Sequence, residues 1–236
     1  MPSDQPQSAS RSVERKTLTD RVYEILREDI LNNRLPPDTP IQEAVIARDL
    51  GVSRGPVREA LQKLSAEGLV EIITHRGAVV TSLTWQEFID AYRVREALES
   101  LATRLATPNL TPDDIAELEQ LHEAMIRHAE AEAVDAFFAA NAQFHHMLVV
   151  KSNNRKLIEM YYPLIDQMRR YRMRSLTLRG GLSKSCDEHK AILDAIKTGD
   201  ADKAAILMSA HIQIPQQILQ SEHAEDELQL VSNNRE

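Results

Sequence analysis

The chain has 236 residues, a formal net charge of −8 and one cysteine, Cys186. Its length allows two domains, its lone cysteine excludes an intrachain disulfide, and it contains no apolar run near the roughly 20 residues that cross a bilayer. We therefore expect a cytoplasmic protein with no membrane partner.

Both ends of the chain are polar. Residues 1–15 contain no apolar core of the kind found in secretory signals, so we expect a disordered tail there. The acidic residues 223–236 are expected to form a frayed tail.

The negative charge is unevenly distributed. Residues 11–80 carry 11 basic and 11 acidic side chains, so most of the excess negative charge lies after residue 80. Salt screens charges beyond about 8–10 Å, so the local charge governs contact with phosphates. The acidic total therefore does not exclude a nucleic-acid partner for the first third of the chain.

The first third is predicted to contain three short helices. Apolar residues at helical spacing indicate a helix over residues 18–30. Pro36 and Pro37 then require a loop that runs to Ile41. A second helix is expected over residues 43–50, and Gly51 ends it and supplies a turn.

The third helix has two distinct faces. Ser53 can cap its start, and Pro56 is tolerated in its first turn. Arg54, Arg58 and Gln62 are spaced four apart and point outward together, whereas the apolar positions form an inward stripe of Val57, Ala60, Leu61 and Leu64. A capped helix with arginines near its N-terminus is typical of a helix that reads the major groove of DNA.

Two short β-branched runs, at 70–74 and 78–81, predict a β-hairpin after this helix. His75, Arg76 and Gly77 would form the tip that joins the strands. Three helices followed by this hairpin make a winged helix-turn-helix domain, which we place at residues 16–82.

Strand signals stop after residue 82. Helical patterns follow at about 84–105, 111–130, 133–151, 154–178, 184–197 and 201–220. Glycine is scarce, so residues 84–222 are predicted to form an all-α antiparallel bundle. The predicted fold is therefore mostly α, with a winged helix-turn-helix domain followed by a helical bundle.

Four polar residues occur at apolar positions of this bundle. Asn141 and His145 are four apart and share one helix face, while His189 and His211 lie on two later helices. Three imidazoles and an amide oxygen could bind Zn, Ni, Cu or Fe. The alternative is a hydrogen-bonded core without metal, because an inward histidine is usually a satisfied core residue.

The first domain resembles the GntR family of bacterial transcription regulators. The similarity is carried by Leu-Pro-Pro at 35–37, Val-Ser-Arg-Gly-Pro-Val-Arg-Glu-Ala-Leu at 52–61, Glu-Gly-Leu at 67–69 and Arg-Gly-Ala at 76–78. Two positions depart from the family pattern. Asp38 replaces the glycine usual after Pro-Pro, and Ala44 replaces an arginine that often contacts DNA.

The second domain resembles FCD, the ligand-binding domain of the FadR branch of that family. The matching residues are Asn141, His145, His189 and His211, which in the family bind a divalent metal, with Asp more usual than Asn at the first position. The resemblance implies a divalent transition metal, with Zn or Ni favoured. It also places Arg95 at a family arginine that can face the pocket and bind a carboxylate; the alternative is a surface arginine paired with Glu99.

The resemblance implies a homodimeric transcription regulator, usually a repressor, that binds a palindromic operator in double-stranded DNA and responds to a small organic-acid effector. The residues expected to contact DNA are Ser53, Arg54, Gly55, Arg58, Arg76 and Gly77. The alternative is a metal-dependent hydrolase or lyase fused to a DNA-binding domain. We see no well-placed general base for that alternative, since Glu188 is expected to face away from His189.

Overall fold

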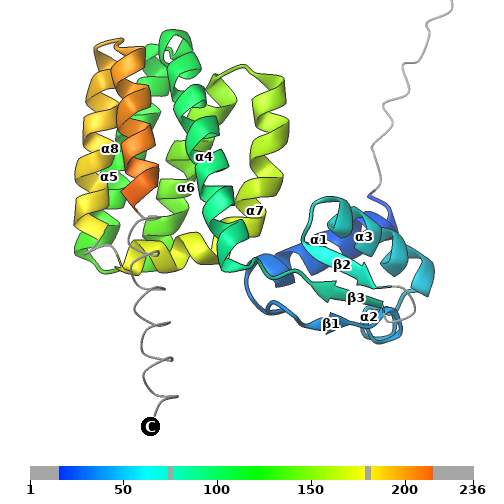
Figure 1. The fold of residues 1–236 in the computed structure, drawn as a ribbon. Coiled ribbons are helices and arrows are strands. Elements are labelled where there is room, and N and C mark those ends of the chain that lie inside the picture. The colour runs from blue at the N-terminus through cyan, green and yellow to red at the C-terminus, as the bar shows by residue number, and fades with distance from the viewer. Residues whose placement is uncertain (1–15, 74–76, 179–181, 215–236) are drawn as a thin grey trace, which may run out of the picture. The chain divides into compact units, whose positions relative to one another are not determined.

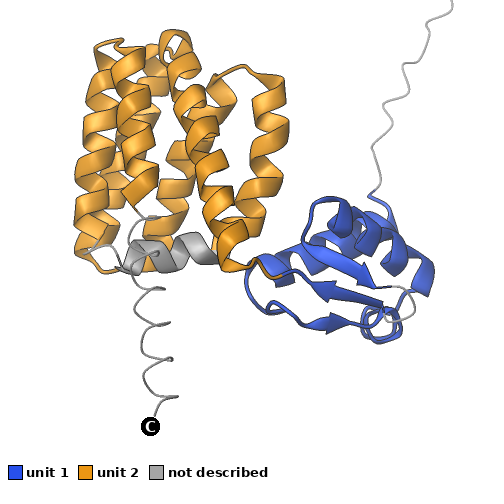
Figure 2. Cartoon of the chain, in the orientation of Figure 1, with its two compact units in different colours: residues 1–81 blue, residues 82–236 orange. Residues whose placement is uncertain are grey.

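The structure is a computed structural model that describes residues 16–73, 77–178 and 182–214. The chain divides into two compact units, residues 1–81 and residues 82–236 (Figure 2). The predicted tails lie outside the described residues. Among the described residues no helix is both long and apolar enough to span a membrane.

Unit 1 contains three helices and a small sheet around one apolar core (Figure 1). Its first helix begins at a capping box, in which Thr17 accepts from the Asp20 N–H and the Asp20 carboxylate accepts from Thr17. The apolar stripe predicted on the third helix is fully buried in this core. The elements are α1 (Leu18–Leu31), α2 (Glu43–Asp49), α3 (Arg54–Ala66), β1 (Pro40–Ile41), β2 (Val70–Ile73) and β3 (Gly77–Val80).

The sheet has three strands rather than the two predicted from the sequence. β1 pairs antiparallel with β3, so that Pro40 lies opposite Val79 and Ile41 opposite Ala78. We expected a loop here because the prolines at 36, 37 and 40 exclude a helix. Pro40 is tolerated because β1 is an edge strand, where a missing N–H leaves no interior ladder bond unmade.

The described residues of unit 2 form helices joined by short loops, without strands, as the sequence predicts. Capping boxes start two of its helices, at Thr84 with Glu87 and at Thr111 with Asp114. Its elements are α4 (Trp85–Ala106), a 3₁₀ turn η1 (Thr107–Asn109), α5 (Pro112–Glu130), α6 (Val134–Lys151), α7 (Arg155–Leu178), α8 (Leu182–Lys197) and a further helix over the described residues 201–214.

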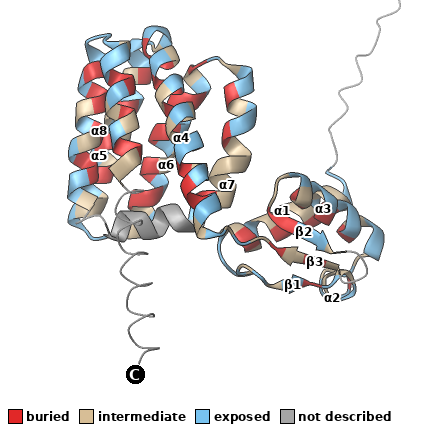
Figure 3. Cartoon of the chain, viewed as in Figure 1, coloured by how far each residue is buried: buried red, intermediate tan, exposed pale blue. Residues whose placement is uncertain are grey.

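The helix α6 is the centre of this bundle. It packs against α4, α5 and α7 and is buried on most of its circumference (Figure 3). Its apolar residues join the largest core cluster of the protein. Because this helix is surrounded, Asn141 and His145 lie deep in the bundle and require polar partners there.

Asp114 links the start of α5 to the end of α6. Its carboxylate accepts from Lys151 Nζ at 2.6 Å and from the Thr111 N–H at 2.9 Å, and these bonds lower its pKa to about 2. A carboxyl whose pKa falls on folding stabilises the protein above its unfolded pKa, near 4, and this stabilisation disappears as pH falls toward 2.

We predict that Asp114→Asn lowers the melting temperature at pH 7 and that its difference from the unmutated protein shrinks below pH 4. Thermal unfolding followed by circular dichroism across this pH range would check the prediction. Asp113→Asn, at the exposed neighbouring position in the same turn, is the control. Equal losses in both variants at pH 7 would contradict the role of the Lys151 ion pair.

Candidate functional site

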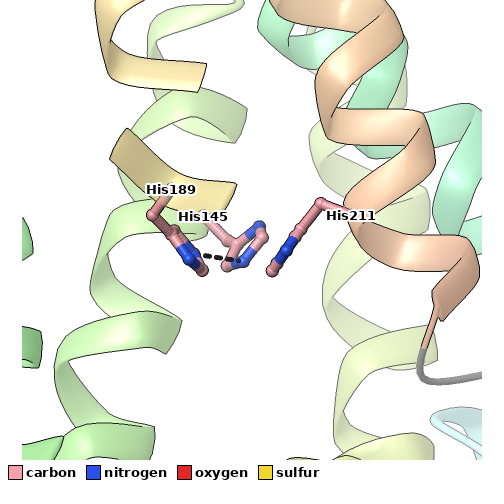
Figure 4. A group of neighbouring side chains, drawn as sticks. All are labelled: His145, His189 and His211. Carbon is pink, nitrogen blue, oxygen red and sulfur yellow. Dashed lines mark hydrogen bonds between the residues drawn. The ribbon is translucent and has the colours of Figure 1, made fainter. Parts of the chain in front are cut away.

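Three histidines from three helices meet inside unit 2 (Figure 4). His145 comes from α6, His189 from α8 and His211 from the helix at 201–214. Each is at most 4% exposed, and one nitrogen from each ring lies within 4.8 Å of those from the others. The structure therefore brings together the three histidines that the sequence predicted as metal ligands.

The Nδ1 atom of each ring has a partner in the protein. For His145 the partner is Glu99 Oε2 at 2.5 Å, for His189 the Ser185 carbonyl oxygen at 2.7 Å, and for His211 Glu188 Oε2 at 2.7 Å. Carbonyl and carboxylate oxygens accept hydrogen bonds, so Nδ1 carries the proton in His189 and His211. The contact of His145 with Glu99 is an ion-pair contact, and a carboxylate at 2.5 Å favours a proton on that Nδ1 as well. In neutral rings the Nε2 atoms then carry lone pairs.

Two of these Nε2 atoms face each other. His189 Nε2 lies 3.2 Å from His145 Nε2. Two lone pairs at this distance repel one another unless a cation stands between them, either a proton or a metal ion. Tetrahedral zinc ligands at about 2.0–2.1 Å from the metal are separated by roughly 3.3 Å, so the observed spacing fits a metal.

Asn141 supplies the remaining candidate ligand. It is 3% exposed, and its Oδ1 has no hydrogen-bond partner among the described residues. A buried amide oxygen costs free energy unless it binds a hydrogen-bond donor, a water molecule or a metal ion. The three imidazoles present thus fit a divalent metal, and Asn141 lies one turn before His145 on the same face of α6.

Behind His145 lies the Arg95–Glu99 ion pair, which is buried and not on the surface. Arg95 Nε donates to Glu99 Oε1 at 2.7 Å, and both side chains are at most 4% exposed. Burial is the largest single influence on Arg95 and lowers its pKa, but the combined effect of Glu99, Tyr92 and Tyr161 raises that pKa overall. Glu99 therefore accepts from Arg95 on one oxygen and contacts His145 with the other.

The sequence offered two interpretations of Arg95: an arginine that faces the pocket and binds an effector carboxylate, or a surface arginine paired with Glu99. It pairs with Glu99, as one alternative held, but it lies in the interior and not on the surface. Its spacing from Glu99 was visible in the sequence, but the contact of Glu99 with a histidine 46 positions later was not. The binding of an effector by Arg95 stays a prediction.

The sequence interpretation of Glu188 was wrong, and a further histidine, His122, is buried. His122 is 7% exposed and its Nε2 lies 3.0 Å from the Cys186 carbonyl oxygen. Glu188, expected to face away, reaches His211 from the preceding helix. The spacing of apolar residues around these two positions does not indicate that they face inward, because each side chain bonds to a residue of another helix. His146 is exposed and contacts Tyr162, as expected of a residue outside the cluster.

On unit 1, the outer face of α3 borders a groove of about 460 Å³. The lining residues come from α2, α3 and the β2–β3 hairpin and include Ala44, Arg54, Arg58, Gln62 and Gly77. Arg58 makes a two-point ion pair with Glu43 of α2, with distances of 3.0 and 2.9 Å. This pair lowers the pKa of Glu43, and it was not foreseen from the sequence.

The structure describes three of the other four residues predicted to contact DNA. Arg76 lies outside the described residues. Gly77 has φ of 94°, and a Cβ there would be 2.9 Å from the Ile41 carbonyl oxygen, so the fold itself requires glycine. Gly55 has open space where its Cβ would be. Ser53 occupies the N-cap position of α3, but its side chain makes no capping bond.

Comparison with known proteins assigns both units to families. Residues 18–80 match "Bacterial regulatory proteins, gntR family", and residues 90–214 match the FCD domain. The chain is 32% identical over 206 residues to a probable D-xylose utilization operon transcriptional repressor of Paenarthrobacter nicotinovorans, covering 87% of this chain and 90% of that protein. It is 29% identical to the transcriptional repressor RspR of Escherichia coli, over 82% of this chain and 85% of that protein.

Solved structures have the same architecture. E. coli McbR/YncC matches with a TM-score of 0.73 and 25% identity, covering 89% of this chain and all of that one. A GntR regulator from Rhodococcus shares the fold, with a TM-score of 0.68 at 23% identity over 85% of this chain and 97% of that one. These relatives are transcription regulators and not enzymes, which argues against the fused metalloenzyme. The chain therefore belongs to the gntR family of bacterial regulatory proteins, as a transcription regulator that joins a gntR helix-turn-helix domain to an FCD domain.

Proposed function

We propose that this protein is a cytoplasmic repressor whose binding to a palindromic operator is controlled by a small organic acid at a metal-containing pocket of the FCD domain. The observation that carries the proposed effector-sensing role is the convergence of three buried imidazoles whose Nδ1 atoms each contact an oxygen within the protein. The repressor assignment is supported by the names of its relatives.

The metal would be held by His145, His189 and His211 through Nε2 and by Asn141 through its amide oxygen. Zn or Ni fits this nitrogen-rich set best. When bound, the metal supplies a Lewis-acidic point for an anionic ligand. Glu99 and Glu188 fix the ring orientations and raise ligand basicity, the usual role of carboxylates behind metal-bound histidines.

The effector would be a small carboxylate. A neutral Asn141 in place of an aspartate leaves the site with one more unit of positive charge, which favours an anionic ligand. Arg95 contributes a guanidinium to the same buried network and is the proposed second anchor for the carboxylate. Binding shifts the operator affinity only if the effector prefers one of the two states of the protein.

The DNA contacts would be made by α3 and the hairpin. Arg54 and Arg58 line the groove beside the hairpin and would reach bases or phosphates. Ser53 would bind a phosphate, Gly55 would let the backbone approach, and Arg76 with Gly77 would meet the minor groove. Two copies related by a two-fold axis would read the two halves of the operator.

Glu43 would hold Arg58 ready for a base. A guanidinium fixed by two bonds keeps its remaining N–H groups in a defined direction and cannot swing to any nearby phosphate. Glu43 is thus proposed as a positioning residue that favours the operator over other sequences.

We predict that the double variant His189→Ala/His211→Ala loses bound metal, because two of three imidazole ligands disappear. Elemental analysis after mild purification would check this, with zinc or nickel supplied in the growth medium. His146→Ala, an exposed histidine next to His145, is the matched control. Stoichiometric metal in the double variant would contradict the ligand assignment and favour the metal-free core.

We predict that Arg58→Ala weakens operator binding by roughly 5- to 150-fold, the range of about 1–3 kcal/mol for a two-point base contact. The duplex would be one selected by the unmutated protein from a random pool, and affinity would be measured by fluorescence anisotropy. Arg127→Ala on α5 is the control. Unchanged affinity for Arg58→Ala would rule out α3 as the reading helix.

We predict a different effect for Glu43→Gln. Freed from its carboxylate, Arg58 reaches phosphates of any sequence, so affinity for a random duplex rises more than affinity for the operator. The ratio of the two affinities therefore falls, whereas a purely structural loss would lower both together. An unchanged ratio would remove Glu43 from the proposal.

A further inference from the structure

A cleft of about 410 Å³ opens between α5 and α8, which pack against each other in unit 2 (Figure 1). Its volume falls at the lower end of the range for small-molecule sites. None of the residues that line it belongs to the histidine cluster. Its walls include His122, Ile126 and Glu130 of α5 and Ser183, Cys186 and Asp187 of α8.

Part of the cleft wall is apolar. Ile126 is 36% exposed, and Cys186 is buried. The pKa of the Cys186 thiol is raised to about 11, chiefly by burial and further by the negative charges of Asp187 and Glu130. The thiol is therefore neutral at pH 7 and acts as a small apolar group. Because carboxylates of both helices act on this one sulfur atom, they face the same part of the cleft.

The two carboxylates carry charge that the chain does not neutralise locally. Neither Glu130 nor Asp187 has an ion-pair or hydrogen-bond partner within residues 16–73, 77–178 and 182–214. Lys190 also lines the cleft, but it is paired with Asp194 on its own helix. The cleft thus combines two exposed acceptors of negative charge with an apolar wall.

A buried imidazole adds a third acceptor. His122 is 7% exposed, and its Nε2 lies 3.0 Å from the Cys186 carbonyl oxygen. A carbonyl oxygen only accepts, so Nε2 carries the proton and Nδ1 of the neutral ring has a lone pair. Nδ1 has no hydrogen-bond partner among the described residues. A buried polar atom of this kind needs a donor, and a molecule bound in the cleft can supply one.

We propose that this cleft binds a small aliphatic amine, as a second ligand site separate from the histidine cluster. The ammonium group would lie between Asp187 and Glu130 and would donate a hydrogen bond to Nδ1 of His122. The methylene groups would pack on Ile126 and Cys186. A carboxylate ligand is disfavoured here, because it would meet two negative groups and no unpaired cation among the described lining residues.

The chemistry of the cleft favours an organic cation over a bare metal ion. A metal needs at least three ligand atoms gathered at one point. Within the part of the chain that the structure describes, the histidine cluster alone brings three metal-binding side chains within 4.8 Å of one another. Amine binding at the cleft needs neither a metal nor the operator, so it goes beyond the proposed function and can fail independently of it.

The first test is isothermal titration calorimetry of the full chain with 1,4-diaminobutane. Saturable binding at one site per chain is expected. The control ligand is 1,4-butanediol, which has the same carbon chain without the charge and is expected not to bind. Absence of amine binding, or equal affinity for the diol, would overturn the proposal.

The second test removes the two carboxylates while keeping their shape. Glu130→Gln/Asp187→Asn is expected to raise the dissociation constant of 1,4-diaminobutane about tenfold, as two solvent-accessible charge pairs permit. The matched control, Glu117→Gln/Glu123→Gln, removes two exposed carboxylates of α5 that do not line the cleft, and it is expected to bind normally. Equal weakening in both double variants would show that the amine responds to overall charge, which would refute the site.

The third test locates the amine without changing the protein. Ring nitrogen shifts of the histidines are followed by nuclear magnetic resonance during titration with 1,4-diaminobutane. Nδ1 of His122 is expected to shift as it accepts a hydrogen bond, whereas His128, on the same helix but outside the cleft lining, is expected to stay unchanged. An unchanged His122 at saturating amine would overturn the proposal, whichever other histidine responds.

Discussion

The structure of unit 2 depends on one constraint, which is that each buried polar side chain needs a hydrogen-bonding or ionic partner. Three imidazoles, an amide, a carboxylate and a guanidinium lie in an interior that would be more stable if it were apolar. Each imidazole Nδ1 lies within 2.7 Å of an oxygen, and the Nε2 atoms of His145 and His189 face each other. A cation between these two atoms relieves the repulsion of their lone pairs, so the site favours a proton or a metal ion.

The histidine cluster and the carboxylates that contact it come from four helices. Glu99 comes from α4, His145 from α6, Glu188 and His189 from α8, and His211 from the last described helix. A metal joined to these rings would tie α6, α8 and the last described helix together at one point.

The face of unit 1 that we propose binds DNA also fixes the direction of a charged side chain before any ligand binds, but on an exposed surface. Arg58 is held by Glu43 through two bonds, so its direction is set before any partner arrives. Such a pair in water contributes little to stability. Its value lies in orientation, which is what discrimination between DNA sequences requires.

The sequence alone determined the helices, the hairpin after α3 and the set of three inward histidines, because periodicity and capping residues are local signals. It could not determine that Pro40 and Ile41 form an edge strand, that His122 is buried, or that Glu188 turns toward His211. Each of these depends on a partner from another element. The tertiary structure also decided the environment of Arg95. The sequence shows that Glu99 is four residues away on the same helix face. It does not show that both side chains are buried, or that Glu99 contacts His145 of α6.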